Sequence, residues 1–366
     1  MSVSPHAKDE SDERIEGLGE DPNESIGYPI DTFLIRTETR TVHDVLRRID
    51  SGNFIMDPEF QRDFVWDENK QSKLIESVLM RIPLPVFYLG EDEHGRMIVV
   101  DGLQRLTTFK RFVKGEFRLN LSGQTELHKK KFDDLPPKLK NRIEDCNLII
   151  YIIDSKVPEK ARLDIFDRVN GGEPLTRQQM RNCLFTGNAT RFLKEQAETE
   201  LFLRATGRSL KPKTMRDREF VNRFCAFQII DADDYSDMDS HLAKALKKMN
   251  ESSFDLATLG VQFQRSLQNN LIIFGEHAFR KPNKNADRRS PLNASFWDVM
   301  STGLSRVSND IVVARQQNIK DAVHNLLTKS DFDAAITYGP NTPDQVRRRF
   351  KLAQRALGEV LNVSAA

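Results

Sequence analysis

The chain has 366 residues, of which 39% are hydrophobic and 30% are charged, as in a water-soluble globular protein. No apolar run approaches the roughly 20 residues that a membrane-spanning helix needs, and the first residues lack the apolar stretch of a secretory signal. The three cysteines are odd in number and far apart, which indicates free thiols in a reducing compartment. We therefore expect a cytoplasmic protein without membrane contact.

The formal net charge of +1 is unevenly distributed. Residues 1–30 contain eight acidic residues against Lys8 and Arg14, which leaves a net charge of +7 for residues 31–366. This N-terminal segment also contains few apolar residues, so that it cannot bury enough surface to offset the entropy of ordering. We therefore expect residues 1–28 to form a disordered acidic tail. Basic stretches such as "QVRRRFKLAQR" permit contact with nucleic acid, although such residues more often solvate a helix face.

Helix and strand patterns alternate after the tail. A helical period in "TVHDVLRRIDSG" predicts a short helix that ends near Gly52, and "DENKQSKLIESVLMRIP" predicts a second one from Asp67 to Pro83. The β-rich runs "VFYLGE" and "RMIVVD" predict two strands, followed by a helix from Leu103 to Lys114. "FRLNL" and "NLIIYIID" predict two more strands, with a helix in "LPPKLKNRIED" between them.

Strand signals nearly vanish after residue 158, and amphipathic helical patterns follow one another. The predicted helices cover residues 159–169, 176–185, 189–203, 216–230, 238–249, 256–274, 293–307, 319–327 and 343–361. We therefore expect an α+β fold, with a small mixed domain at residues 29–155 and an all-α helical domain at residues 156–366.

The junction between the strand "MIVVD" and the helix after it carries the main chemical signal. Asp101 and Gly102 stand where the strand ends and the helix begins. A helix N-terminus has unpaired backbone N–H groups and a partial positive charge, which attract phosphate. Arg105 would bring its guanidinium over the same opening, and Thr107 and Thr108 would add hydroxyls.

Asp101 complicates a phosphate site, because a carboxylate repels phosphate unless a cation intervenes or the carboxylate binds a sugar hydroxyl. An acid beside an anion site therefore indicates a metal ion or a ribose. The alternative is a capping box, in which Asp101 is the N-cap, Gln104 is its partner and no ligand is needed. The two interpretations are compatible, and the sequence leaves both open.

A second polar cluster lies upstream in "DPEFQRDFVWDENKQ". Arg62, beside Gln61, would be a second cation for phosphate, and Trp66 would be a stacking platform for a base. The alternative, which the sequence favours slightly, is that Trp66 is an anchor of the hydrophobic core.

A third cluster lies in "DIFDRVNGGEPLTRQQMRN". The sequence predicts an ordinary helix C-cap at Asn170, Gly171 and Gly172. The next helix would begin after Thr176, which is its predicted N-cap. Polar side chains crowd around this glycine-rich corner, so that it can also face a ligand. They belong to Arg168, Asn170, Gln178 and Arg181.

Other common sites are absent from the sequence. The cysteines lack the paired CxxC spacing of a zinc site, and no GxxxxGK[ST] phosphate loop occurs. Any nucleotide hydrolysis would have to use the Asp101 junction.

Taken in order, the segments "PEFQRDFVWDENKQSKLIESVLMRIPLPVFYL", "VVDGLQRLTT" and "FDRVNGGEPLTRQQMRN" resemble the GmrS-type N-terminal domain of GmrSD-like type IV restriction systems. This domain belongs to the ParB and sulfiredoxin-like superfamily, and the resemblance covers residues 35–190. It implies a nucleotide-handling fold whose Asp-Gly-x-x-Arg signature binds, and often hydrolyses, a nucleoside triphosphate.

The resemblance also implies roles for individual residues. Asp101, Gln104 and Arg105 would be catalytic, and Asp101 would hold Mg²⁺ that arrives with the nucleotide. Leu103 stands where the common family form has Gln, which removes one polar group. The implied nucleotide-binding residues are Gln61, Arg62, Trp66, Gly102, Thr107, Thr108, Asn170, Gly171 and Gly172.

Longer relatives add a His-Asn-His nuclease, but His241, His277 and His324 are isolated in helical sequence. The resemblance therefore implies a Mg²⁺-dependent NTPase or NTP sensor of bacterial antiphage defence, with DNA or a separately encoded nuclease as further partners. The alternative function is a non-enzymatic, ParB-like DNA-binding or adaptor module, in which the junction is only a capped helix or grips a DNA phosphate.

Overall fold

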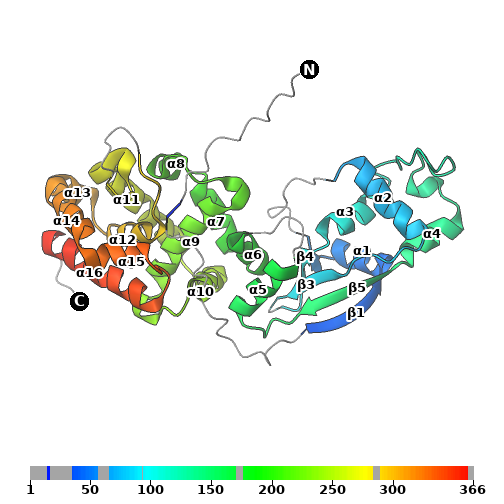
Figure 1. The fold of residues 1–366 in the computed structure, drawn as a ribbon, viewed down its shortest axis with the longest axis horizontal. Helices are drawn as coiled ribbons and strands as arrows, with labels where there is room; N and C mark the ends of the chain where they lie inside the picture. The colour runs from blue at the N-terminus through cyan, green and yellow to red at the C-terminus, as the bar shows by residue number, and fades with distance from the viewer. Residues whose placement is uncertain are drawn as a thin grey trace, which may run out of the picture. The chain divides into compact units, whose positions relative to one another are not determined.

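The computed structural model describes residues 15–16, 35–56, 66–92, 94–169, 176–282 and 289–361 (Figure 1). It divides into two compact units. The sheet unit comprises residues 26–186, and the helical unit comprises residues 187–366 together with residues 1–25. The fold is α+β as expected, with a small five-stranded sheet in the first unit and helices throughout the second.

The sheet has the strand order β1-β5-β3-β4-β2. Its strands are β1 (Ile35–Thr41), β2 (Phe54–Ile55), β3 (Phe87–Glu91), β4 (Met97–Asp101) and β5 (Asn147–Ile153). β1 pairs antiparallel with β5, β3 pairs parallel with β5 and antiparallel with β4, and β2 pairs parallel with β4. Consequently β2 and β4 end at the same end of the sheet, where β3 begins.

Four helices cover one face of this sheet (Figure 1). They are α1 (Val42–Asp50), α2 (Glu68–Leu79), α3 (Leu103–Val113) and α4 (Pro137–Glu144). Leu148, Ile150 and Ile152 of β5 pack into their shared core and alternate with less buried residues, as expected for a strand with one covered face. The predicted Asp67 cap is confirmed, since its carboxylate accepts from Lys70 N–H at 2.8 Å.

The helices α5 (Glu159–Val169) and α6 (Arg177–Leu184) pack on the opposite face at Gly90. A Cβ at Gly90 would lie 3.0 Å from Phe166 Cζ and 3.5 Å from Leu184 Cδ2. Arg162 Nη2 also donates to the Glu91 carbonyl at 2.8 Å. Because both helices are built onto β3, the sheet unit extends to Thr186, beyond the boundary at residue 155 that the sequence suggested.

The segment "FRLNL" is not a strand, which corrects the prediction. Phe117, Leu119 and Leu121 are buried and alternate with exposed residues, as a strand would require. However, Leu119 N–H donates to the Lys130 carbonyl at 3.0 Å, within a loop, and Asn120 N–H donates to Ser72 Oγ at 2.8 Å. The alternation therefore comes from a loop packed on the helices and not from pairing in the sheet.

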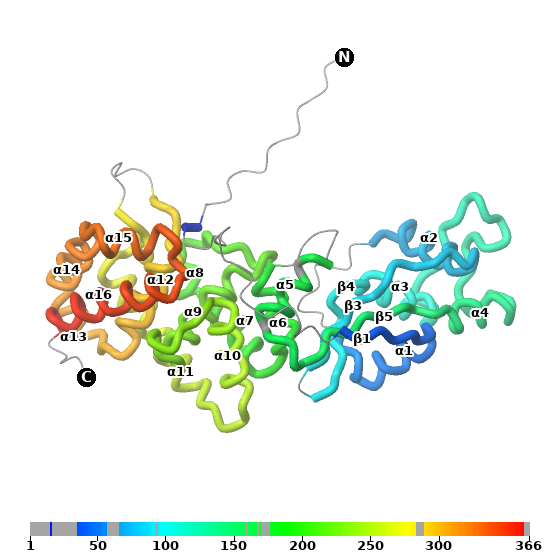
Figure 2. Tube along the Cα trace, turned by 60° about the horizontal axis from the view of Figure 1, so that its bottom comes forward, coloured from blue at the N-terminus to red at the C-terminus, as the bar shows by residue number. Residues whose placement is uncertain are grey.

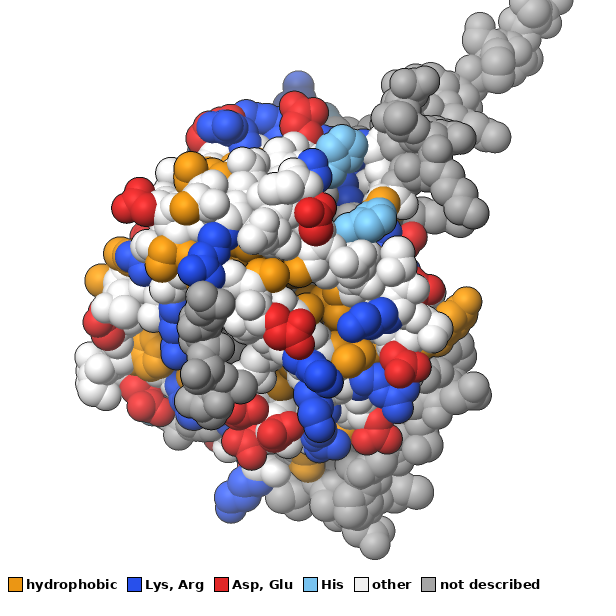
Figure 3. Space-filling view, turned by 90° about the vertical axis from the view of Figure 1, so that its left-hand side faces the viewer, with side chains coloured by type: hydrophobic (Ala, Val, Ile, Leu, Met, Phe, Trp, Pro, Cys, Tyr) orange, Lys and Arg blue, Asp and Glu red, His pale blue; other side chains and the backbone are white. Residues whose placement is uncertain are grey.

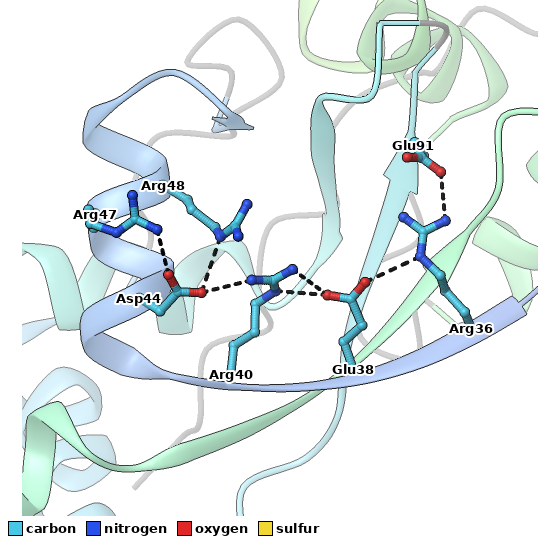
Figure 4. A network of polar contacts seen from close by, with 7 residues as sticks. All are labelled: Arg36, Glu38, Arg40, Asp44, Arg47, Arg48 and Glu91. Carbon is cyan, nitrogen blue, oxygen red and sulfur yellow. Dashed lines mark hydrogen bonds and ion pairs between the residues drawn. The ribbon is translucent and has the colours of Figure 1, made fainter.

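β1 is an edge strand that the sequence did not reveal, and charged side chains hold it in place (Figure 4). Arg36 Nη1 donates to Glu91 Oε2 at 2.7 Å, and Arg40 Nη1 donates to Asp44 Oδ2 at 2.8 Å, which links β1 to β3 and to α1. Asp44 accepts from Arg40, Arg47 and Arg48. Burial by itself would raise the pKa of Asp44, but these hydrogen bonds keep that pKa well below its usual value. Charges along an edge strand also discourage its pairing with another chain.

Part of the acidic N-terminal segment is ordered, contrary to the expected disordered tail. Glu16 forms a parallel β-bridge with Asn293. Its N–H donates to the Leu292 carbonyl at 2.9 Å, and its carbonyl accepts from Ala294 N–H at 2.9 Å. The Asn293 side-chain amide donates to Glu16 Oε2 at 3.2 Å. Apart from Ile15 and Glu16, residues 1–28 lie outside the described part of the chain.

The helical unit is built around α12 (Ala294–Gly303), which packs against α9, α11, α15 and α16 (Figure 2). The other helices are α7 (Asn188–Ala197), α8 (Glu200–Thr206), α9 (Arg216–Ile229), α10 (Met238–Asn250), α11 (Leu256–Phe274), α13 (Asn309–Ala314), α14 (Gln316–Thr328), α15 (Ser330–Thr337) and α16 (Pro343–Leu361). The single helix predicted over 189–203 is divided into α7 and α8, because Thr199 caps a new helix by accepting from Phe202 N–H. α13 and α15 were not predicted.

A buried ionic cluster joins three helices of this unit. Asp298 of α12 is 0% exposed, and both of its carboxylate oxygens accept from Arg223 of α9, at 2.8 and 2.7 Å. Arg349 of α16 donates to the same carboxylate at 2.7 Å and also to the Pro340 carbonyl. One carboxylate therefore pairs with two buried guanidiniums, and Arg349 Nε has no hydrogen-bond partner among the described residues.

Removing the carboxylate should destabilise the helical unit strongly. We expect Asp298→Ala to lower its free energy of unfolding by about 3–5 kcal/mol, because two buried cations lose their counter-charge. Urea unfolding followed by the fluorescence of buried Trp297, in a Trp66→Phe background, measures this. Asp344→Ala, at a side chain that is 95% exposed, is the control and should change stability by less than about 0.5 kcal/mol. Equal effects of the two substitutions would contradict the role of the cluster.

His241 of α10 lies beside this cluster and is almost fully buried. Its ring packs against Phe227 and Tyr235, with centroids 4.5 and 5.2 Å away, and its Nε2 has no hydrogen-bond partner among the described residues. Burial lowers the pKa of His241 to about 4, against a smaller opposing effect of the Asp298 carboxylate. The imidazole is therefore neutral in the folded protein at neutral pH.

This buried imidazole makes the stability of the helical unit depend on pH. The unfolded chain binds a proton at His241 near pH 6.5 and the folded chain does so only near pH 4, so stability falls as the pH drops through this window. The loss should be on the order of 3 kcal/mol. His241→Phe should flatten this part of the pH profile, as measured by urea unfolding between about pH 7 and about pH 4. An unchanged profile in the variant would refute the assignment.

Candidate functional site

The junction between β4 and α3 depends on a glycine in the left-handed region. Gly102 is the N-cap of α3 and has a φ of 98°. A Cβ at this position would lie 2.3 Å from Phe87 Cδ1 and 2.8 Å from Phe87 Cε1. Glycine is therefore required for both the turn and the close packing of Phe87 beneath it.

The capping box considered for Asp101 and Gln104 does not form. Gly102 is the N-cap, and α3 has no side-chain cap. The Asp101 carboxylate instead accepts from Arg105 Nη2 at 2.8 Å. The first turn of α3 therefore keeps the uncapped backbone N–H groups that an anion site needs.

Arg105 lies inside the domain and not over the helix opening where the sequence suggested it. Its side chain is 11% exposed, and its guanidinium carbon lies 4.1 Å from the centre of the Phe87 ring. It donates to the Pro85 carbonyl, to the Val86 carbonyl at 3.0 Å and to Asp101. Burial lowers the pKa of Arg105, and the Asp101 carboxylate opposes that shift. Arg105 thus holds Asp101 in position.

Asp101 itself remains accessible. Its side chain is 36% exposed, and only Oδ2 takes part in the ion pair with Arg105. Across the sheet it stands in register with Tyr88 of β3, which stands in register with Tyr151 of β5. The two tyrosine rings are 5.4 Å apart. Neither tyrosine was predicted as a site residue, although each lies in a segment that the sequence predicts to be a strand.

The polar residues of α3 differ in their surroundings. Thr108 is fully buried, and its hydroxyl donates to the Gln104 carbonyl at 2.7 Å, so its role is structural. Gln104 Oε1 and Thr107 Oγ1 are buried without a hydrogen-bond partner among the described residues. Such an atom costs free energy until a partner satisfies it. Both lie within the first two turns of α3.

Trp66, the stacking candidate, packs on the hydrophobic core of the sheet unit. Its carbonyl accepts from Gln71 Nε2 at 2.9 Å, which fixes the start of α2. This supports the core-anchor interpretation. Gln61 and Arg62 lie outside the described residues.

The glycine-rich corner at Asn170, Gly171 and Gly172 also lies outside the described residues. After it, the predicted N-cap is confirmed, since Thr176 Oγ1 accepts from Gln179 N–H at 3.2 Å and Thr176 N–H donates to Gln179 Oε1 at 2.7 Å. Within α6, Gln178 and Arg181 are buried and joined by a 3.0 Å hydrogen bond. These two polar side chains are therefore part of the protein interior.

The basic stretch of α16 does not form a continuous basic surface. Arg347 pairs with Asp344 at 3.7 Å, Arg355 pairs with Glu359 at 3.3 Å, and Arg349 is buried. Figure 3 shows basic and acidic side chains interspersed over the end of the helical unit that carries α13, α14 and α16. This pattern is typical of a solvated helix face.

The described residues contain no group of three or more His, Cys, Asp or Glu side chains placed to hold a metal ion. Likewise, none of the described helices has the length and apolar character needed to cross a bilayer. A single accessible carboxylate such as Asp101 suits Mg²⁺ that is bound mainly by the phosphates of a nucleotide.

Residues 42–186 match the family model described as GmrSD restriction endonuclease, N-terminal domain. This part of the sheet unit is similar to GmrSD N-terminal domains. The match confirms the resemblance seen in the sequence and assigns this domain to a restriction-type defence family. It ends where the sheet unit ends, so that the GmrSD domain includes α5 and α6. No curated protein and no solved structure matches the chain.

Gly102 should be far less tolerant of substitution than another left-handed glycine of the same domain. Gly52 has a φ of 75° and nothing within 4 Å of an added Cβ, so Gly52→Ala costs only backbone strain of about 1–2 kcal/mol. Gly102→Ala adds a collision with buried Phe87, and we expect a total of about 3 kcal/mol or more. Hydrogen exchange should show faster opening of β4 and α3 in Gly102→Ala alone. Similar exchange in both variants would argue against close packing on Phe87.

Proposed function

We propose that this GmrSD domain binds a nucleoside triphosphate with Mg²⁺ where β4 meets α3, and hydrolyses it as part of antiphage defence. One observation carries the proposal: an accessible carboxylate, Asp101, is held by a buried guanidinium beside the uncapped first turn of a helix. Family membership supports a restriction-type role for the domain.

The proposed role of each group follows from its surroundings. The first-turn N–H groups of α3 bind phosphate oxygens, because they have no side-chain cap and lie at the positive end of the helix dipole. Asp101 Oδ1 binds the Mg²⁺ of the nucleotide, while Oδ2 stays paired with Arg105. Mg²⁺ held there with the nucleotide would supply positive charge next to the phosphates.

Gln104 and Thr107 supply the remaining polar contacts. Their buried, unpartnered oxygens accept hydrogen bonds from a water molecule or a ribose hydroxyl, which would remove the cost of leaving them unsatisfied. The ring of Tyr88, in register with Asp101, offers an apolar surface for the base. Arg105 is a positioning residue, since it acts on the ligand through Asp101.

The proposal includes a partner for DNA cleavage. His241 is buried between aromatic rings, and the described residues contain no group of three or more His, Cys, Asp or Glu side chains placed to hold a metal ion. A separately encoded nuclease would then carry out cleavage of DNA in response to the nucleotide state of this domain.

The carboxylate can be tested with an isosteric change. Asp101→Asn keeps an oxygen that accepts from Arg105 but removes the charge that attracts Mg²⁺. We expect it to weaken Mg²⁺-dependent NTP binding at least about tenfold and to lower turnover by about two orders of magnitude. Calorimetric titration with ATP, GTP, CTP and UTP, with and without Mg²⁺, measures the binding, and phosphate release measures the turnover.

Asp133→Asn, at a side chain that is 87% exposed in the same domain, is the matched control and should behave as the unmodified protein. Turnover that is unaffected by Asp101→Asn would remove the catalytic claim. Steep, salt-dependent binding of duplex DNA without any nucleotide binding would favour the adaptor function instead.

A further inference from the structure

A long groove in the helical unit has no role in the function proposed above. It lies between α7 and α11, is also lined by residues between α12 and α13, and has a volume of about 990 Å³. The residues of α11 that line it extend from Leu256 to Gln268, which corresponds to about 18 Å along the helix axis. This length accommodates roughly 12 residues of a helix.

The floor of the groove is apolar, and the helices α7 and α11 lie close together beneath it at Gly260. Gly260, in the second turn of α11, faces the Phe192 ring of α7, and a Cβ at Gly260 would lie 3.4 Å from Phe192 Cε2. Beside it Val261 is 56% exposed, one of the few large hydrophobic side chains at the surface of this unit. A 2.6 Å hydrogen bond between Gln264 and Gln196 ties the two walls together.

The rim of the groove is positively charged. Arg191, Arg265 and Arg306 line it, against the single carboxylate of Glu195. Arg265 and Arg306 form no ion pair with any residue that the structure describes, whereas Arg223 and Arg355 of the same unit are paired with carboxylates. Two unpaired guanidiniums around an apolar floor therefore remain available to a ligand.

An apolar floor with an arginine rim matches an acidic amphipathic helix. Its apolar stripe, at spacings of three and four residues, would pack on the accessible side chains of Leu256, Ala257 and Val261, and its flanking carboxylates would pair with Arg265 and Arg306. Arginine and buried aromatic side chains are the residue types that dominate protein–protein interfaces. Single-stranded nucleic acid fits less well, because it binds on exposed aromatic rings and Phe192 is only 6% exposed.

We propose that the groove between α7 and α11 is the docking site for an acidic, amphipathic helix of a partner protein. This inference rests on the helical unit alone and does not depend on nucleotide binding by the GmrSD domain. The docked segment carries apolar side chains on one face and carboxylates at both edges of that face.

The test selects ligands from random 16-residue peptides displayed on phage, with the immobilised full-length chain as bait. We expect enriched peptides to be acidic, with apolar residues at helical spacing. A selected peptide, labelled for fluorescence anisotropy, should bind at least about tenfold more weakly to the Arg265→Glu, Arg306→Glu double variant. Gly260→Leu, which fills the floor, should weaken binding independently of charge.

The matched control is the Arg348→Glu, Arg355→Glu double variant, which makes the same charge change on α16, outside the groove. It should bind the peptide as the unmodified protein does, and so should Asp101→Asn. No enrichment, enrichment of basic peptides, or equal binding by the groove and control variants would overturn the proposal. Labelled single-stranded DNA that binds tightly and loses affinity only in the groove variants would also overturn it.

Discussion

The guanidinium of Arg105 connects the fold of the sheet unit to its candidate site. It stacks on Phe87, donates to the carbonyls of Pro85 and Val86, and pairs with Asp101. These contacts join the start of β3, the end of β4 and the first turn of α3. Because Phe87 also fills the space above Gly102, the position of the accessible carboxylate is a result of core packing. A charged residue of the candidate site thus contributes to it through the interior of the domain.

Elements with local signals were predictable. β3, β4, β5 and the helices α1 to α4 follow from apolar periodicity and from caps such as Asp67, because those patterns are contained within a few residues of sequence. β1 was not predictable, because "IRTETRT" has no apolar stripe and is stabilised by pairing with β5 and by the charges in Figure 4. Conversely, the loop "FRLNL" has the alternating apolar pattern of a strand, because every second side chain is buried in the core of the sheet unit.

The candidate site shows the same division between local and distant causes. Asp101 and Gly102 could be placed at the end of a strand because the junction is local. The orientation of Arg105 could not, because its partners Pro85 and Val86 lie 20 and 19 residues away in the chain. In the helical unit, Arg223 and Arg349 lie in basic stretches of sequence, and only the tertiary structure shows that both are buried around Asp298.

The bridge between Glu16 and Asn293 has a consequence for how the protein can be dissected. Since the helical unit comprises residues 1–25 as well as residues 187–366, the GmrSD domain is an insertion, and two covalent crossings join it to its host. Cutting the chain after Thr186 would separate Glu16 from the Ala294 N–H and the Asn293 amide with which it is bonded. A faithful helical fragment therefore needs a segment that carries Glu16 in addition to residues 187–366.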